Sequence, residues 1–584
     1  PFTAPSLPYH EPAIAPILVL SAFLLLLNIL NAVLDRAVYC GLLGQVLIGI
    51  TWGTPGARWL PTQVEDVVVQ LGYLGLILLV YAGGLSTSFR ALKANLLLSS
   101  AVALTGIAVP IALSYSLQGL LGATPLQAFA AGAALCSTSL GTTFTVLASS
   151  GLSPTRLGIV LTSAAMMDDV VGLIMVQVIS NLGGDSISAI TVVRPVLVSV
   201  AFAVIVPLAC RFLVKPITMV LNQYRKTHRD ARISKLLSLR SAAFTFHTSL
   251  LVALVAGASY AGTSNLFAAY IAGAAISWWD SEVPHPNTHL ETAQESAVQE
   301  KTRETGPASD GNATSEAAAT GEDEVDARRN SRQGSAVQRK PTEHSEEPLL
   351  VEDVTSGSAI YERYYQQAVT RILQPFFFAS IGFSIPTTRM FTGSIVWRGI
   401  VYTILMSFGK LVCGLWLVRF STPPVRDAFR KMPSKMKLPS APHLWGKSKN
   451  RRRPAENNAG ESIPQDSQPS NAAHAVSHSH TASVPRPFSL HPPLILALAM
   501  TARGEIGFLI SAVAESRGVF SQSSQTPGSE SDIFLIVTWA IVLCTIIGPL
   551  GVGLSVRRVK VLEARKNGEH EGAGRDVLGV WGVE

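Results

Sequence analysis

Two adjacent carboxylates interrupt a long apolar run. Asp168 and Asp169 lie in "SAAMMDDVVGLIMVQVI", residues 163–179. One ionised side chain at the centre of a membrane helix costs about 2.5–3.5 kcal/mol on insertion scales, and two adjacent ones also repel each other. Neighbours on a helix point about 100° apart, so the pair can line two sides of one polar cavity. This arrangement suits a hydrated cation. The alternative is that one aspartate pairs with a basic residue and only joins two helices.

A dense run of hydroxyl groups precedes the aspartates, in "ALCSTSLGTTFTVLASSG". Serine and threonine side chains hydrogen-bond their own backbone, and Gly141 lowers the cost of unwinding, so this segment is expected to break at mid-membrane. The freed carbonyls and hydroxyls would be hard oxygen ligands for a cation. Packing of helices through small residues is the alternative for this run. The hydroxyl-bearing residues are Ser137, Thr138, Ser139, Thr142, Thr143 and Thr145.

Two later apolar segments contain charged residues that are expected to be buried. Lys410 lies in "YTILMSFGKLVCGLW" with apolar sequence on both sides, so it needs a partner unless it snorkels to the interface. Arg503 and Glu505 lie in "ALAMTARGEIGFLISAV" at positions i and i+2, which do not face each other on an unbroken helix. Either these two residues pair with other segments or the helix breaks at Gly504.

The elements that hold these residues are predicted to be membrane helices. Of the 584 residues, 48% are hydrophobic and 15% are charged, against roughly 25% charged in a soluble domain. Apolar segments of about 20 residues predict an all-α polytopic membrane protein of about 13 transmembrane helices. No run shows the ten-residue alternation of a membrane β-barrel. The segments lie near residues 12–34, 37–53, 67–87, 97–120, 126–149, 157–181, 190–214, 243–261, 263–279, 366–388, 393–419, 489–514 and 532–556.

Basic residues indicate how the chain crosses the membrane. Lysine and arginine gather in the loops after odd-numbered segments and in the tail "VRRVKVLEARK", which predicts an N-terminus outside and a C-terminus in the cytoplasm. The net charge of +7 then meets anionic inner-leaflet lipid, and no nucleic-acid partner is expected. We expect the membrane to be the plasma membrane or that of an acidic organelle. The five cysteines fall in or beside apolar segments, so they are expected to be core residues: Cys40, Cys136, Cys210, Cys413 and Cys544.

Two polar insertions divide the chain. The stretch 280–358 is acidic and 422–488 is basic, and both are predicted to be disordered cytoplasmic loops because they lack apolar periodicity. The remaining parts are residues 1–279 with the first nine segments, 359–421 with the next two, 489–556 with the last two, and the cytoplasmic tail 557–584.

A weak internal repeat relates the segments. "YLGLILLVYAGGLSTS" resembles "QPFFFASIGFSIPTT", "STSLGTT" corresponds to "TARGEIG", and the aspartate segment corresponds to 532–556. The two halves lie an odd number of segments apart, so they would be inverted. Inverted repeats place two broken helices around a site at the membrane midplane.

In this order the motifs resemble the monovalent cation:proton antiporter superfamily, in its two-aspartate sodium/hydrogen exchanger branch. The resemblance covers nearly every apolar segment but neither polar insertion, and its specific part is "MMDDVVGLIM". It implies the sodium/proton antiporter fold and a homodimer, in which a core bundle with two crossing discontinuous helices slides against a dimerisation bundle. The other matching stretches are "VYCGLLGQVLIGITWGTP", "LGLILLVYAGGL", "STSLGTTFTVLAS", "FAAYIAGAAIS", "PFFFASIGFSI" and "TARGEIGFLI".

The resemblance also implies roles for individual residues. Asp168 and Asp169 would bind the transported monovalent cation and protons, with Asp169 as the direct ligand and Asp168 as the partner of Lys410. Ser86 stands where many relatives carry an acidic residue, which leaves a partner for Arg503 unassigned. The crossover hydroxyls would be Ser137, Thr138 and Ser139, and the charge-compensating residues Lys410, Arg503 and Glu505.

Competition between protons and Na⁺ or Li⁺ for the same oxygens would couple their movements without any covalent step, so neither an enzyme activity nor a cofactor is expected. A K⁺/H⁺ antiporter of the same superfamily is an alternative, although no glycine fingerprint of a nucleotide-binding domain follows residue 556. A sodium-coupled organic-anion symporter would need an anion site, which the aspartate pair opposes. A membrane-embedded enzyme or scaffold is a third class, and the chain has no HExxH-type metal motif.

Overall fold

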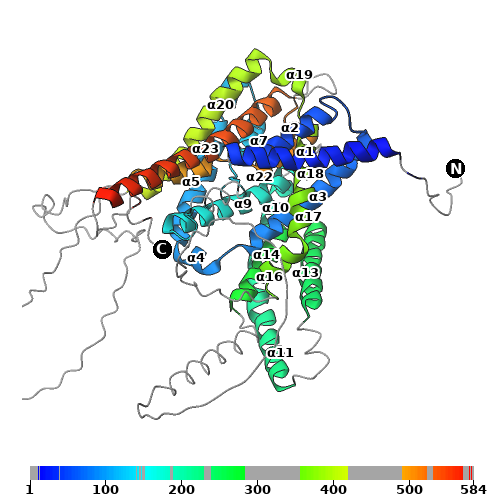
Figure 1. Cartoon of the computed structure of the whole chain (residues 1–584), viewed down its shortest axis with the longest axis vertical. Helices are drawn as coiled ribbons and strands as arrows, with labels where there is room; N and C mark the ends of the chain where they lie inside the picture. Colours follow the sequence, from blue (N-terminus) through cyan, green and yellow to red (C-terminus); the bar gives the residue numbers. More distant parts are fainter. Residues whose placement is uncertain are drawn as a thin grey trace, which may run out of the picture.

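The computed structural model describes residues 13–38, 40–139, 151–183, 189–228, 239–282, 355–418, 489–521 and 531–569, with the single residues 11, 141, 143, 147, 578 and 581. Every regular element in these ranges is helical, which confirms the all-α prediction (Figure 1). In this part of the chain nine helices are long and apolar enough to cross a membrane, and α2 (Leu42–Trp52) is a shorter apolar helix. The total of about 13 helices and the inverted repeat stay predictions. Most of the two polar insertions, 283–354 and 419–488, lies outside the described residues.

One group of helices packs around α3, which lies between α14 and α18. The α3–α14 contact is made backbone to backbone, because Gly84 and Gly273 face each other across it. A Cβ on Gly84 would come within 2.2 Å of the Tyr270 carbonyl oxygen, and one on Gly273 within 2.2 Å of that of Tyr81. Small residues allow this approach in membrane helices. The group consists of α1 (Ile14–Val38), α2, α3 (Thr62–Leu85), α13 (Arg240–Ala261), α14 (Asn265–Glu282) and α18 (Gln374–Phe383).

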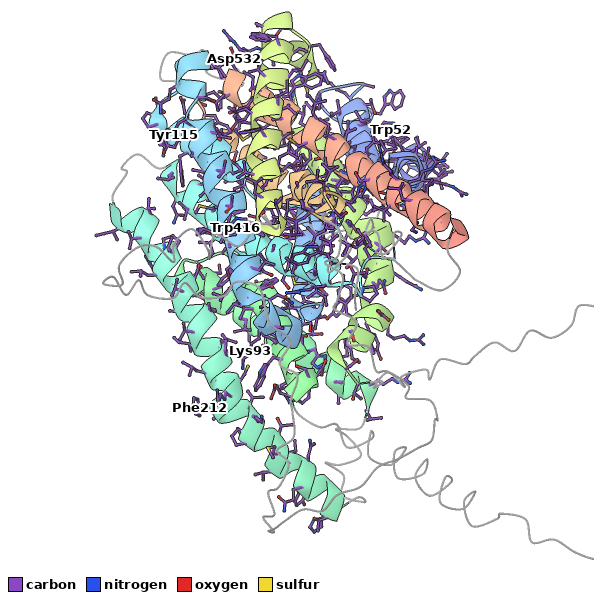
Figure 2. The ribbon with its side chains drawn as sticks, turned by 90° about the vertical axis from the view of Figure 1, so that its left-hand side faces the viewer. Trp52, Lys93, Tyr115, Phe212, Trp416 and Asp532 are labelled. Atoms are coloured by element: carbon purple, nitrogen blue, oxygen red, sulfur yellow. The ribbon has the colours of Figure 1, made fainter. Side chains whose placement is uncertain are left out.

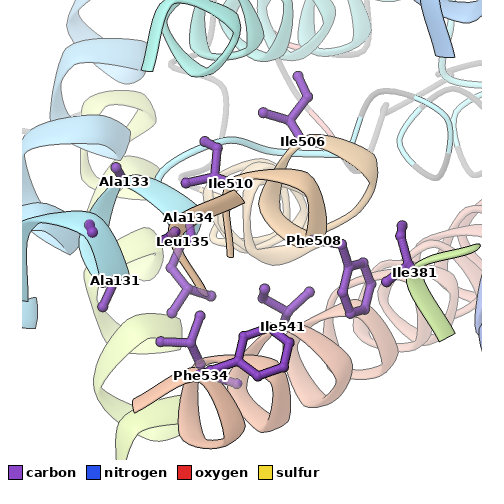
Figure 3. Close-up of a cluster of buried hydrophobic side chains, with 14 of the residues drawn as sticks. Ala131, Ala133, Ala134, Leu135, Ile381, Ile506, Phe508, Ile510, Phe534 and Ile541 are labelled. Carbon is purple, nitrogen blue, oxygen red and sulfur yellow. The ribbon is translucent and has the colours of Figure 1, made fainter. Parts of the chain in front are cut away.

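A second group of helices surrounds the aspartate pair. Its apolar centre lies where the end of α7 meets α22 and α23, and Figure 3 shows Leu135, Ile510 and Ile541 converging there. Because α7 lies in the first half of the chain and α22 and α23 near its C-terminal end, this cluster joins distant parts of the sequence. The group consists of α5 (Leu96–Ser114), α7 (Pro125–Ala134), α9 (Arg156–Leu182), α20 (Gly393–Leu411), α21 (His491–Thr501), α22 (Glu505–Ser516) and α23 (Asp532–Glu569).

Two non-helical stretches cross inside the second group. Helix α21 ends at Thr501 and α22 begins at Glu505. One of the two expected breaks therefore lies at residues 502–504, all of which the structure describes. Helix α7 ends at Ala134, and the chain runs on without helix to Ser139, whose backbone N–H donates to the Ala502 carbonyl at 3.0 Å. Both alternatives for Arg503 and Glu505 are observed, because the helix breaks at 502–504 and both side chains hydrogen-bond the other crossing stretch. Much of 140–150 lies outside the described residues.

Two helices extend beyond their expected apolar ranges. Helix α10 (Ala189–Ala209) continues through a π-helical turn, Cys210–Val214, into α11 (Lys215–Thr227), where a loop was expected after residue 214. Figure 2 shows Phe212 on this continuous helix, and α11 projects away from the other helices in Figure 1. Helix α23 likewise runs to Glu569. Lysine, arginine, leucine and glutamate are good helix formers, so helix continues where the apolar pattern stops.

Candidate functional site

The two aspartates lie near the middle of α9 and point to different surroundings. Asp168 is completely buried, and Asp169 is 7% exposed. Asp168 contacts residues of α20 and of the non-helical stretch after α7. Asp169 lines a cavity between the two groups of helices. The adjacent carboxylates therefore occupy two different environments, as their helical spacing requires.

Asp168 forms a buried ion pair with Lys410. Lys410 Nζ lies 2.6 Å from Asp168 Oδ2, and neither side chain is exposed. The hydroxyl of Thr138 donates to the same carboxylate oxygen at 2.6 Å. Lys410 Nζ also donates to the Cys136 carbonyl at 2.6 Å, so the lysine is held in the interior and does not snorkel. Charge and hydrogen bonds together compensate the desolvation of this pair.

Arg503 binds the backbone at the end of α7. Its Nη1 donates to the carbonyl oxygens of Ser137 at 2.7 Å and Cys136 at 3.3 Å. These carbonyls lie in the non-helical stretch just after α7, and Arg503 and Lys410 both donate to them. Arg503 is completely buried, and the Cys544 side chain of α23 also contacts its guanidinium group. Backbone carbonyls thus provide the arginine with partners that its sequence context did not identify.

Ser86 does not replace the acidic residue as a partner of Arg503. Its hydroxyl donates to the Gly83 carbonyl at 2.9 Å, and its side chain lines the cavity of Asp169. The backbone of Arg503 is fixed instead by Thr545 of α23, whose hydroxyl donates to the Arg503 carbonyl at 2.8 Å. A hydroxyl in an apolar segment is a weak signal, so sequence reasoning missed Thr545.

Glu505 begins α22 and faces the other crossing stretch. Ser139 Oγ donates to Glu505 Oε2 at 3.1 Å, and the backbone N–H groups of Gly141 and of Glu505 itself hydrogen-bond the carboxylate. A carboxylate at a helix N-terminus complements the partial positive charge there. The crossing thus places positive side chains at the end of α7 and a negative one at the start of α22. Of the three expected crossover hydroxyls, that of Thr138 bonds Asp168 and that of Ser139 bonds Glu505. Ser137 instead contributes its backbone carbonyl, which accepts from Arg503.

The cavity beside Asp169 has a volume of about 270 Å³. Asp169 makes no hydrogen bond to a described residue, so its carboxylate is available to a ligand in the cavity. Tyr270 closes one side, with its hydroxyl 3.0 Å from that of Thr87. Among the described residues no group of three or more His, Cys, Asp and Glu side chains could hold a resident metal ion. The lining consists of Leu76, Leu79, Val80, Ala82, Gly83, Ser86, Gly141, Asp169, Leu173, Tyr270, Glu505 and Ile506.

Comparisons with known proteins agree with the motifs. Residues 19–295 match the family model described as "Sodium/hydrogen exchanger, transmembrane". The chain is 32% identical over 152 residues to the Na(+)/H(+)-K(+) antiporter GerN of Bacillus cereus, an alignment that covers 26% of this chain and 39% of that protein. It is 28% identical over 247 residues to the probable Na(+)/H(+) antiporter GerT of Bacillus cereus, covering 42% and 61%.

A third relative is the high-affinity Na(+)/H(+) antiporter NhaS3 of Synechocystis, with 30% identity over 140 residues, covering 24% of this chain and 30% of that protein. The chain thus spans less than two thirds of the length of each of these curated relatives. The solved structure of the sodium proton antiporter MjNhaP1 from Methanocaldococcus jannaschii aligns over 95% of this chain and 97% of that chain, with 13% identity and a TM-score of 0.43.

The matched family model includes the aspartate helix, and all three relatives are named as antiporters. Residues 19–295 are therefore similar to sodium/hydrogen exchangers, and the named relatives support a place for the chain in the monovalent cation:proton antiporter superfamily.

Proposed function

We propose that this protein exchanges a monovalent cation, Na⁺ or Li⁺, for protons across a membrane, and that it belongs to the two-aspartate branch of its superfamily. One observation carries the proposal: Asp169 is a buried carboxylate without a hydrogen-bond partner among the described residues, and it faces a cavity between two groups of helices. An ionised carboxylate inside a membrane marks an ion or proton pathway.

Coupling arises because a cation and a proton compete for the Asp169 oxygens. A bound cation or a bound proton neutralises the carboxylate, whereas an empty ionised site keeps an uncompensated charge in a low-dielectric surrounding. The proposal is that the site changes sides only when it is neutral. Each crossing then carries either a cation or protons, and the two flows are coupled without a covalent intermediate.

The Asp168–Lys410 pair gives this exchange a second charged element. We expect Lys410 to neutralise Asp168 when the site is empty and to release it when a cation binds. Two aspartates with one lysine then favour more than one proton per cation, so that exchange moves net charge. The buried 2.6 Å pair is the structural support for this step.

The change of sides is proposed to be an elevator-type movement. The cavity lies between α3 and α14 of one group and α9 and α22 of the other, so sliding of the second group would carry Asp169 relative to the first. We further propose a homodimer joined through the first group of helices. The N-terminus would lie outside and the C-terminus in the cytoplasm, and the chain would divide into membrane segments and polar insertions as its sequence predicts.

K⁺/H⁺ exchange is the second candidate. It is favoured by one relative, whose name includes K⁺ beside Na⁺ and H⁺. The carboxylate site itself offers hard oxygen ligands, which do not by their type separate Na⁺ from K⁺.

Proton movement in proteoliposomes tests the proposal. The full chain is reconstituted with a pH-sensitive dye inside, and Na⁺, Li⁺ and K⁺ are added separately at equal concentration, with protein-free liposomes as the control. We expect Na⁺ or Li⁺ to move protons in the opposite direction. A larger response to K⁺ would favour the second candidate, and the absence of a response to all three cations would contradict antiport.

A further inference from the structure

Two carboxylates from different helices face the same cavity. Asp169 of α9 and Glu505 of α22 both line it, whereas Asp168 does not. We propose that the transported cation is held between Asp169 and Glu505, so that Glu505 is a cation ligand. Asp168, the counter-charge of Lys410 in the empty site, takes no part in the coordination. This inference rests on the proposed function and names a second carboxylate for the same site.

Asp168 is poorly placed to be the second ligand. Its Oδ2 accepts from Lys410 Nζ and from Thr138 Oγ1, both at 2.6 Å. Its Oδ1 has no partner among the described residues, but the lysine already neutralises the carboxylate at hydrogen-bond distance. A cation would therefore gain less from Asp168 than from a carboxylate that has no cationic neighbour in contact.

Glu505 is held with its carboxylate at the cavity. Ser139 Oγ and the Gly141 backbone N–H hydrogen-bond it from the opposite crossing stretch. A Cβ on Gly141 would lie 3.2 Å from Glu505 Oε1, so the glycine leaves room for this oxygen beside the cavity. The carboxylate is thereby fixed before any ion arrives, which lowers the ordering cost of binding.

A glutamate at a helix N-terminus also stabilises that helix by itself, so Glu505 alone would not indicate a ligand. The second observation concerns Asp169. Only 7% of this residue is exposed, and it makes no hydrogen bond to a described residue. Two carboxylates that face one cavity repel each other, and a cation placed between them is attracted to both. The geometry thus fits an occupant with positive charge.

The occupant is an alkali cation that keeps part of its hydration. A cavity of about 270 Å³ is much larger than a bare ion and has room for several water molecules. Water and the hydroxyl groups of Ser86 and Tyr270, which also line the cavity, can complete the oxygen coordination. Hard oxygen ligands are those that such ions prefer.

Two substitutions of Glu505 separate ligation from helix stabilisation. Glu505→Gln removes the charge, and Glu505→Asp keeps the charge at the start of α22 but withdraws the carboxylate by one methylene. We expect Glu505→Gln to raise the KM for Na⁺ on the order of tenfold, with a smaller change in the maximal rate. Glu505→Asp should also raise KM while it keeps the thermal stability of the wild type, so it carries the test if Glu505→Gln does not fold.

The matched control is Glu65→Gln. Glu65 is 8% exposed and accepts hydrogen bonds from Thr54 Oγ1 at 2.8 and 3.0 Å, but it does not line the cavity. Its KM should stay within twofold of the wild type. A second readout is the rise in unfolding temperature on addition of Na⁺, which should be smaller in both Glu505 variants because a ligand stabilises the state it binds.

The wild type and the Asp169→Asn variant separate a failure of the proposed function from a failure of the proposed role of Glu505. If the wild type shows no cation-dependent proton movement, the proposed function fails. If the wild type is active and Asp169→Asn is inactive, but folded Glu505→Gln or Glu505→Asp keeps the wild-type KM and the Na⁺-dependent stabilisation, then only the role of Glu505 is overturned.

Discussion

Lys410 Nζ lies 2.6 Å from Asp168 Oδ2, in a pair of which neither side chain is exposed to solvent. The pair joins α20 to α9 across 242 residues of sequence. Thr138 bonds both partners, at 2.6 Å to the carboxylate and 3.2 Å from the ammonium, and so ties the end of α7 to the same point. Three helices of the second group thus depend on one neutral cluster.

Removal of the lysine alone should destabilise the fold. Lys410→Ala leaves Asp168 as an uncompensated buried charge, and breaking such a pair costs about 3–5 kcal/mol. The measurement is unfolding of the purified variants in detergent. The double variant Asp168→Ala with Lys410→Ala should recover much of the loss, because no unpaired charge remains. Equal stability of Lys410→Ala and the wild type would show that the pair contributes nothing.

Loss of the lysine's charge should also change the response to voltage. Lys410→Gln spares much of the side-chain volume but removes one charge from the site, so exchange should become less electrogenic. Transport is measured in proteoliposomes at several imposed membrane potentials, each at the same pH. A variant with the potential dependence of the wild type would reduce Lys410 to a helix anchor.

The crossing should be sensitive to a single methyl group at Gly504. The backbone there is extended, with φ −164°, so its conformation does not require glycine. Space does, because a Cβ would come within 2.5 Å of Ser139 Oγ. Gly504→Ala is therefore expected to destabilise the protein by about 1–3 kcal/mol through overpacking.

Gly119→Ala is the control for this substitution, since a Cβ at Gly119 meets nothing within 4 Å. Its effect on the unfolding temperature should be small or slightly stabilising. Were the two alanine variants to unfold at the same temperature, the close approach of the crossing stretches would be refuted.

The acidic insertion should be dispensable for basal exchange. Residues 290–350 lie outside the described part of the chain, and their sequence lacks apolar periodicity. The elements on either side already meet, because the Gly357 backbone N–H donates to Asp280 Oδ2 at 2.7 Å. Deletion of 290–350 should therefore keep the basal exchange rate, measured by cation-dependent proton movement. A shortened chain that fails to insert or fold would show that this stretch is more than a linker.

Sequence reasoning identified the helical class and the unusual charges, because a carboxylate or lysine in an apolar run is visible locally. It also offered two explanations for the Arg503–Glu505 stretch, a broken helix and partners on other segments, and the structure shows both. It could not assign Arg503 to the carbonyls of Cys136 and Ser137, because backbone acceptors have no sequence signature. Nor could the residues alone show which way each aspartate faces, since that depends on where α3, α20 and α22 lie relative to α9.

The ends of two helices also differ from those predicted from the sequence. The apolar pattern stops near residue 214 in one segment and near 556 in another, but helix continues to Thr227 and Glu569. Hydropathy reports the part of a helix that can lie in lipid, whereas helix propensity decides where the helix ends.

The most direct test of the central claim is proton movement driven by Na⁺ in proteoliposomes that contain Asp169→Asn. This variant keeps the shape of the side chain but loses the charge that would bind the cation and the proton. The same substitution at the exposed Asp66 is the control and should leave exchange unchanged. We predict that Asp169→Asn is folded and shows no Na⁺-dependent proton movement. Wild-type exchange by a folded Asp169→Asn protein would contradict the account.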